Sequence, residues 1–248
     1  MKSTKLFNID YHPLPKKYIL EEMEKLIAKN DSFKQVVSLN PENIVIAQHD
    51  NEFSKVLSQS DYQIVDGIGI VLAEMFLGRN ITMRITGVDL MVHVLNLCYG
   101  MSLSIGFIGG EENLAEGLAN CYQQKYPRSK FFGISGFRNK DDQNPSEIKN
   151  IIDRVAVNRP QIVFVAFGSP YQEKWIWENR DIFKGVICIG VGGAFDFLSG
   201  KIPRAPKIIR NMGLEWLFRL LMQPWRIGRQ MRLPQFLLLV IKMKLKFA

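Results

Sequence analysis

The sequence predicts an α/β fold, with a Rossmann-like parallel sheet and a basic helical appendage at the C-terminal end. Short apolar segments alternate with amphipathic segments of helical length between about residues 34 and 200. Such alternation is typical of right-handed βαβ units and a parallel sheet. After Gly200 the strand pattern stops and the chain becomes strongly basic. We therefore predict an α/β domain at residues 1–200 and a helical appendage at residues 201–248.

The composition fits one domain plus an appendage. The 248 residues are 47% apolar and 23% charged, which is ordinary for a globular protein with a sizeable core. The first fifteen residues lack a signal-peptide pattern, and no apolar run approaches the ~18 residues of a membrane span. The cysteines Cys98, Cys121 and Cys188 lie far apart without metal-ligand spacing, so we expect reduced thiols and a cytoplasmic location.

Each predicted strand is a short apolar or β-branched run that ends at a turn residue. The predicted strands are 5–9, 34–39, 62–65, 102–108, 130–134, 161–167 and 185–191. The segments between them carry apolar residues at helical spacing, and several open on a proline or a capping residue. The predicted helices begin at or just after Pro15, Pro41, Asn51, Gly67, Thr86, Glu112, Pro145 and Pro170.

The appendage is predicted to be helical. One helix covers 206–222, and Pro224 and Pro234 are expected to break the rest into short helices because proline lacks a backbone N–H. We expect the apolar face of the segment before Pro224 to pack on the α/β domain. We expect the segment after Pro224 to make fewer contacts with that domain.

Asp66 is the first candidate for chemistry. It follows the predicted strand 62–65 and precedes Gly67-Ile68-Gly69, so its carboxylate is expected at the C-terminal edge of the sheet. Ligands of open α/β sheets bind along that edge, and the glycines allow close backbone approach. The alternative is that Asp66 caps the following helix.

Other strand ends also carry small or polar residues. Glycines that open helices expose backbone N–H groups at a positive helix end, which suits phosphate. Together these turns favour a nucleotide or diphosphate pocket, although a tight βα turn uses glycine anyway. The turns are Ser38-Leu39-Asn40, Gly109-Gly110, Gly168-Ser169-Pro170 and Gly192-Gly193.

Gln172 lies in the first turn of the helix after Pro170. If it faces the predicted pocket, its amide could hydrogen-bond a sugar hydroxyl. The alternative is an exposed glutamine at a helix start.

Several common motifs are absent. The third glycine of a dinucleotide fingerprint would fall on Leu72, which argues against a nicotinamide-dependent oxidoreductase. The chain has no P-loop, no HExxH zinc motif and no GxSxG elbow. It also has no Asp-x-Asp motif, so we expect no metal and no other cofactor. A bound diphosphate would then be balanced by backbone donors and by Arg or Lys.

The positive charge belongs to the appendage. Residues 201–248 carry eleven Lys and Arg and one acid, Glu215, for a charge of +10, whereas the other 200 residues carry −2. Arg219, Arg226 and Arg229 could share a helical face if Pro224 only kinks the helix. Arginines interleaved with Trp, Phe and Leu suit an anionic membrane surface better than nucleic acid. A homo-oligomer is compatible with the sequence.

Several blocks of the chain, in order, resemble the WecG/TagA/CpsF glycosyltransferases (family 26), which include the N-acetylmannosaminyltransferases of wall teichoic acid linkage units. The resemblance extends from about Ser38 to Arg232. The blocks are Asp66-Gly67-Ile68-Gly69, Arg84-Ile85-Thr86-Gly87-Val88-Asp89-Leu90, Gly168-Ser169-Pro170-Tyr171-Gln172-Glu173-Lys174, Gly190-Val191-Gly192-Gly193-Ala194-Phe195-Asp196, Arg204-Ala205-Pro206 and Gly213-Leu214-Glu215-Trp216-Leu217-Phe218-Arg219-Leu220.

The resemblance implies an inverting transfer of a sugar, most simply N-acetylmannosamine, from a UDP-sugar donor to an undecaprenyl-diphosphate-linked acceptor. The enzyme would lie on the inner face of the bacterial cell membrane as a peripheral protein. Within the family the donor could instead be UDP-glucose or a UDP-uronic acid, in capsule or exopolysaccharide synthesis. A non-catalytic membrane-binding module is a further alternative.

The resemblance also implies residue roles. Asp66 would be the general base, with Ser38, Asn40 and Gln172 beside it; Ser38 stands where the family has threonine. Arg219, Arg226 and Arg229 would meet the diphosphates at the membrane. The UDP-sugar would be bound by Arg84, Gly109, Gly110, Gly168, Pro170, Gly192, Gly193 and Asp196.

Overall fold

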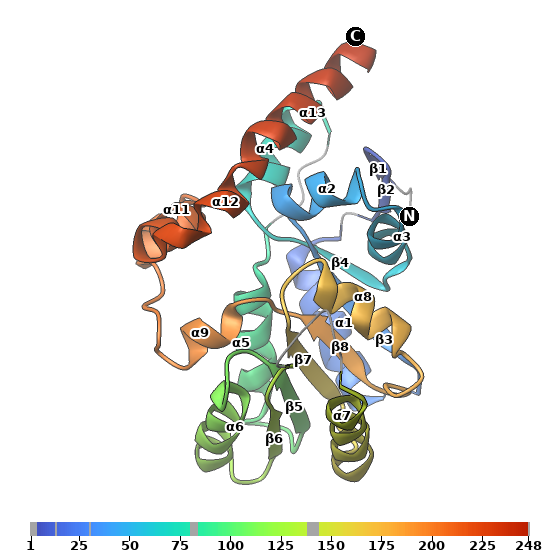
Figure 1. The fold of residues 1–248 in the computed structure, drawn as a ribbon, viewed down its shortest axis with the longest axis vertical. Helices are drawn as coiled ribbons and strands as arrows, with labels where there is room; N and C mark the ends of the chain where they lie inside the picture. Colours follow the sequence, from blue (N-terminus) through green and yellow to red (C-terminus); the bar gives the residue numbers. More distant parts are fainter. Residues whose placement is uncertain (1–3, 13, 30, 80–83, 138–143, 248) are drawn as a thin grey trace.

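A computed structural model of the chain describes residues 4–12, 14–29, 31–79, 84–137 and 144–247. Its centre is a six-stranded parallel sheet in the order β4-β3-β8-β7-β5-β6 (Figure 1). The predicted α/β class and Rossmann-like architecture are therefore confirmed. The strands are β3 (Lys34–Leu39), β4 (Tyr62–Val65), β5 (Ser104–Gly109), β6 (Lys130–Ile134), β7 (Ile162–Ala166) and β8 (Ile187–Gly190).

Helices cover both faces of this sheet, because successive residues of each buried strand point to opposite sides. Val36 packs on one side with α1, α5 and α6, whereas Val37 packs on the other side with α2, α3 and α4. Two more helices, α7 and α8, cover the rest of that second face. The bounds are α1 (Lys16–Ala28), α2 (Pro41–Ala47), α3 (Asn51–Gln59), α4 (Ile68–Phe76), α5 (Gly87–Leu97), α6 (Leu114–Lys125), α7 (Pro145–Asn158) and α8 (Tyr171–Glu178).

The predicted first strand is in fact a hairpin. β1 (Thr4–Leu6) and β2 (Ile9–Tyr11) pair antiparallel, and the chain reverses at Phe7, whose φ is 58°. The prediction of a continuous strand at 5–9 was wrong. The turn is formed by Phe7 and Asn8, so neither glycine nor proline marks it in the sequence. The hairpin buries Leu6, Ile9 and Tyr11 in the same cluster as α2 and α3.

The appendage is helical, but its breaks differ from the prediction. The predicted helix 206–222 is two helices, because Gly213 adopts a φ of +77°. Pro234, expected to end a helix, lies in the first turn of one, where no N–H is needed. α9 (Ala194–Leu198) precedes the appendage, whose elements are α10 (Lys207–Asn211), α11 (Glu215–Met222), a 3₁₀ turn η1 (Pro224–Arg226), α12 (Ile227–Gln230) and α13 (Arg232–Phe247).

The expected docking pattern of the appendage is also reversed. α10 and α11, before Pro224, contain no buried residue. α13, after it, lies against α2 and α4 and buries Phe236 and Val240 in the core cluster of those helices (Figure 1). Phe236 is fully buried and its ring meets that of Phe7 edge-on, 6.2 Å between centroids. The apolar run in α13 is therefore partly a docking face.

Within the described residues, no helix combines the length and the apolar character that crossing a membrane requires.

Gly213, two residues before α11, packs closely against α4. A Cβ on this residue would lie 2.5 Å from Cβ of Ile68 in α4, and its φ of +77° is already unfavourable for other residues. We expect Gly213→Ala to lower the free energy of unfolding by about 2–4 kcal/mol, from backbone strain plus overlap. Gly200 has the same φ but no atom within 4 Å of its Cβ position, so Gly200→Ala should cost only the strain. Equal losses in urea unfolding would contradict the contact with Ile68.

Candidate active site

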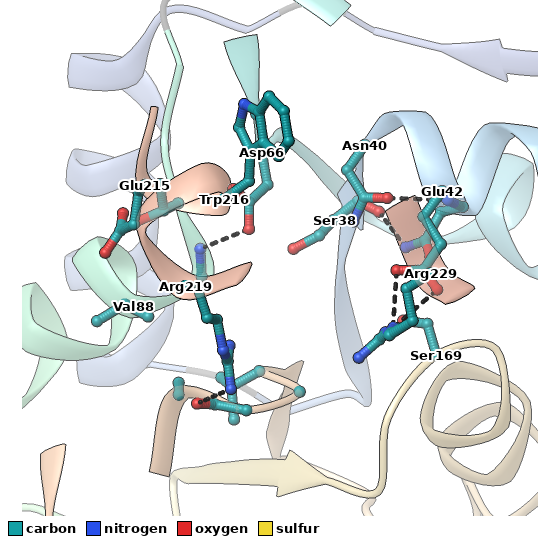
Figure 2. Close-up of a pocket in the computed structure, with 18 of the residues that line it drawn as sticks. Ser38, Asn40, Glu42, Asp66, Val88, Ser169, Glu215, Trp216, Arg219 and Arg229 are labelled. Atoms are coloured by element: carbon teal, nitrogen blue, oxygen red, sulfur yellow. Dashed lines mark hydrogen bonds and ion pairs between the residues drawn. The ribbon is translucent and has the colours of Figure 1, made fainter. Parts of the chain in front are cut away.

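A cleft of about 240 Å³ lies at the C-terminal ends of β3, β4 and β8, under the appendage (Figure 2). This is the edge at which the sequence places its strand-end residues. Of the predicted site residues, the cleft is lined by Ser38, Asn40, Asp66, Arg84, Gln172, Gly192, Gly193, Arg219, Arg226 and Arg229.

Asp66 is held at the end of β4 by its neighbours. Its backbone N–H donates to the carbonyl of Leu39 at 2.8 Å, which continues the β3–β4 ladder by one residue. Its Oδ2 accepts from the backbone N–H of Gly87, the first residue of α5, at 3.2 Å. α4 begins after Gly67 with no side-chain cap, so the alternative that Asp66 caps α4 is wrong.

The surroundings of Asp66 raise the pKa of its carboxyl group to about 6, mainly because burial removes water from the charged form. The hydrogen bond from Gly87 opposes this rise. The negative charges of Glu215 and Asp89 add to the rise, and the positive charge of Arg84 opposes it. A carboxylate with a pKa near neutrality is still ionised at pH 7 and is a stronger base than an ordinary aspartate.

Ser38 and Asp66 approach the same point in the cleft. A Cβ placed on Gly87 would lie 3.8 Å from Oγ of Ser38 and 3.9 Å from Oδ2 of Asp66. Gly87 therefore keeps the space between hydroxyl and carboxylate open. Asn40 caps α2, with its Oδ1 accepting from the N–H of Asn43 at 2.8 Å. Its amide nitrogen has no hydrogen-bond partner among the described residues and lies where a ligand could bind.

Gln172 is almost fully buried, and its amide is already used. Its Oε1 accepts from the N–H groups of Gly168 and Gly192, both at 3.1 Å, and its Nε2 donates to Glu173 at 2.7 Å. The side chain thus ties the turn after β7 to the turn after β8. These contacts show that Gln172 holds two turns at the cleft, and its burial contradicts the alternative of an exposed glutamine.

Glu173 lies beneath Gln172 and is fully buried. It accepts from the hydroxyl of Ser169 at 2.8 Å as well as from Gln172, and burial raises the pKa of its carboxyl group. It supports the turn that carries Ser169 to the wall of the cleft.

Three arginines of the appendage form the cationic wall. Arg219 pairs with Asp196 at 3.0 Å and donates to the carbonyl of Gly193 at 3.3 Å, and Arg229 pairs with Glu42 at 2.9 Å. Although they lie on α11, η1 and α12 rather than on one helix, Arg219, Arg226 and Arg229 all line the cleft.

Arg226 differs from its two neighbours. Among the described residues its guanidinium has no carboxylate within ion-pair distance and no hydrogen-bond acceptor, although its backbone N–H donates to the carbonyl of Gln223 at 3.0 Å. Burial and the positive charges of Arg219 and Arg229 lower the pKa of its guanidinium to about 10. A half-buried cation that is repelled by two others is a strong attractor for a multiply charged anion.

Two more arginines fix the appendage beside the cleft. Arg204 pairs with Asp89 of α5 at 2.6 Å and with Glu215 of α11 at 3.1 Å. Arg84 donates to the carbonyl of Arg210, near the end of α10. Arg84 lines the cleft as predicted, but its hydrogen bond also anchors the appendage.

Five predicted residues do not line this cleft: Gly109, Gly110, Gly168, Pro170 and Asp196. Gly109 and Gly110 lie at the end of β5, and β7 lies between β5 and β8 in the sheet, so this turn is away from the cleft. Gly109 packs against Phe167, and Gly110 packs against Leu114. Asp196 acts through Arg219.

Sequence reasoning did not single out Glu42, Thr86, Glu215 or Trp216 as site residues, although all four line the cleft. For Glu42 the sequence offers one signal, which is an acidic residue in the first turn of a predicted helix. That signal indicates where the helix starts and does not indicate that Glu42 pairs with an arginine.

No group of three or more His, Cys, Asp or Glu side chains placed to hold a metal ion occurs within the described ranges.

The fold and the cleft define a class: an α/β protein with a carboxylate of raised pKa at the sheet edge and a cationic wall beside the glycine turns. The model of the glycosyl transferase WecG/TagA/CpsF family matches residues 4–248, and the chain belongs to this family of glycosyltransferases. The match includes the segment after Arg232 that the sequence motifs did not reach.

Two relatives carry the same name, N-acetylglucosaminyldiphosphoundecaprenol N-acetyl-beta-D-mannosaminyltransferase. The protein of Bacillus subtilis (strain 168) is 30% identical over 242 residues, which cover 98% of this chain and 92% of the relative. That of Staphylococcus aureus (strain MW2) is 30% identical over 211 residues, which cover 85% of this chain and 81% of the relative.

If Asp66 is the general base, it works only when ionised, so the kcat/KM of this glycosyltransferase should rise with pH through a midpoint near 6 and then level off. Below that midpoint the rate should fall about tenfold per pH unit. Glu215→Gln removes a charge that raises the pKa of Asp66, so the midpoint should move to lower pH. Glu112→Gln, at an exposed residue outside the cleft, serves as the control and should leave it in place. An unchanged midpoint in Glu215→Gln would contradict this assignment.

Proposed function

We propose that this chain is an inverting glycosyltransferase that moves N-acetylmannosamine from UDP-N-acetylmannosamine to undecaprenyl-diphosphate-linked N-acetylglucosamine. One observation carries the proposal: a single cleft holds both Asp66, whose pKa is raised, and Arg226, whose guanidinium has no counter-ion in the described part of the chain. The names of the B. subtilis and S. aureus relatives support the sugar and the acceptor.

The proposed reaction is a single displacement. Asp66 removes the proton from the acceptor hydroxyl as its oxygen attacks the anomeric carbon of the donor sugar. The bond between that carbon and the diphosphate breaks at the same time, and UDP leaves with the bonding electron pair. Attack from the face opposite the leaving group inverts the anomeric configuration.

The appendage arginines would stabilise the charge that develops on the leaving diphosphate. Arg226 is available without breaking an existing ion pair, whereas Arg219 and Arg229 are already held by Asp196 and Glu42. The start of α4, which has no side-chain cap, adds a positively polarised helix end at the cleft. On this account the transfer needs no divalent metal.

A peripheral position on the inner face of the cell membrane is the proposed location. The appendage exposes large apolar side chains beside its cations, among them Leu221, Trp225 and Leu245, each more than 70% exposed. Such a surface suits an anionic bilayer, where apolar groups enter the interface and cations meet head groups.

The function is tested with a panel of UDP-sugars and a short-chain lipid acceptor, with UDP release as the readout. UDP-N-acetylmannosamine should give the highest kcat/KM, and Asp66→Asn should lower kcat by about 100-fold or more. Asp153→Asn, on the exposed face of α7, should keep the wild-type rate. Faster transfer from UDP-glucose or a UDP-uronic acid would assign another donor, and full activity of Asp66→Asn would remove Asp66 as the base.

If arginines rather than a metal balance the leaving diphosphate, the rate should be unchanged in EDTA. Arg226→Gln should lower kcat by about 10²–10³-fold, comparable with loss of one donor to a developing negative charge. Lys242→Gln, on the exposed face of α13, removes the same charge from the appendage outside the cleft. Equal losses in both variants would indicate membrane attraction rather than contact with the diphosphate.

A further inference from the structure

A second cavity, apolar and about 670 Å³ in volume, lies between α4 and α13. α4 contributes Ile68, Gly69, Leu72, Ala73 and Phe76, which follow one another at the spacing of a single helix face. The facing residues of α13 are Leu233, Phe236, Leu237, Val240 and Ile241, again on one face. We call this cavity the α4–α13 groove.

The base of the groove is formed by buried side chains, and its rims are exposed to solvent. Ala73, Phe236 and Val240 are buried at its base, whereas Leu72 and Leu237 are each 54% exposed along its rims. Its length along α13, from Arg232 to Ile241, is about 14 Å at 1.5 Å per residue. The groove is therefore a trough for an elongated apolar group.

The inner end of the groove is polar and opens into the active-site cleft. Asp66, Trp216 and Arg229 line both cavities. Arg232 lines the groove at the same end and pairs with Glu42 at 2.8 Å. A molecule that lay in both cavities would place its anionic part by the arginines and its apolar part between the two helices.

We propose that the α4–α13 groove binds the first part of the hydrocarbon chain of the polyprenyl diphosphate acceptor, an inference that rests on the proposed function. The acceptor is an amphiphile whose diphosphate joins sugar to lipid. With the diphosphate at the arginine wall and the sugar hydroxyl at Asp66, the groove gives the chain an apolar path out of the cleft. The outer end of the groove lies among the exposed apolar residues of α4 and α13, so the rest of the chain can enter a bilayer there.

A second copy of the protein is a poorer occupant. A helix or loop that filled the trough would bring apolar side chains against Asp66, Glu42 and Arg232 at its inner end. A lipid whose head group is anionic matches both the apolar walls and the cationic end.

The proposal is tested by narrowing the groove without altering charge. Leu72→Trp adds a large apolar side chain at the rim, and Met75→Trp makes a similar change at an equally exposed residue of α4 outside the groove. Each variant is assayed in the same detergent with two acceptors that share a head group, one with an undecaprenyl chain and one with a short alkyl chain. Leu72→Trp should raise KM for the long-chain acceptor by about tenfold, equivalent to about 1.4 kcal/mol of lost apolar contact. KM for the short-chain acceptor should not change, and Met75→Trp should affect neither.

Equal effects of Leu72→Trp on the two acceptors, or no effect on either, would overturn the groove while leaving the proposed function intact. A second measurement does not depend on turnover. A polyprenyl phosphate with a photoreactive group in its first isoprene units should cross-link to peptides of α4 and α13, mapped by mass spectrometry. Cross-links confined to Leu221 and Trp225 would show that the chain leaves over the outer face of the appendage instead, and would also overturn the proposal.

Discussion

Glu42 accepts hydrogen bonds from Arg229 and Arg232, and this cluster holds the basic appendage over an otherwise slightly acidic domain. Glu42 lies in the first turn of α2, directly after the end of β3, so its place is set by the sheet. Exposed ion pairs contribute little to stability, but these three side chains are only partly exposed and form a network. Arg204 makes a second such link, between α5 and α11.

Both cavities depend on that docking. α11, η1 and α12 supply the arginines of the cleft, and α13 supplies one side of the groove. Both are in place because this part of the chain packs at the C-terminal edge of the sheet. Phe236 provides the apolar part of the same attachment, since it is buried with residues of α2, α4 and the N-terminal hairpin. The appendage is thus part of the site, although it follows the last strand of the sheet.

The sequence predicted the sheet, and the position of Asp66 at its edge, for a simple reason. A parallel strand that is buried on both faces is a short apolar run, and a carboxylate directly after it, as at Asp66, must lie at the sheet edge. The order of strands has no such local signal, so the Gly109-Gly110 turn was assigned to the site although β7 lies between it and β8. Partners distant in sequence were equally hidden: Glu42 and Arg229 are 187 residues apart. The contacts of Gln172 were also hidden, because a glutamine at a helix start gives no sign that two backbone N–H groups from separate turns will donate to its oxygen.

The raised pKa of Asp66 also has a thermodynamic meaning for the folded chain. The ordinary value of 3.8 holds when the chain is unfolded, and the folded value is about 6. Folding therefore favours the protonated acid, and stability declines as pH rises between these two values. Above pH 6 the native state carries a penalty of up to about 3 kcal/mol, at 1.36 kcal/mol per unit of pKa. If Asp66 is the base, as proposed, the same negative charge that lowers stability above pH 6 is the one that the reaction needs.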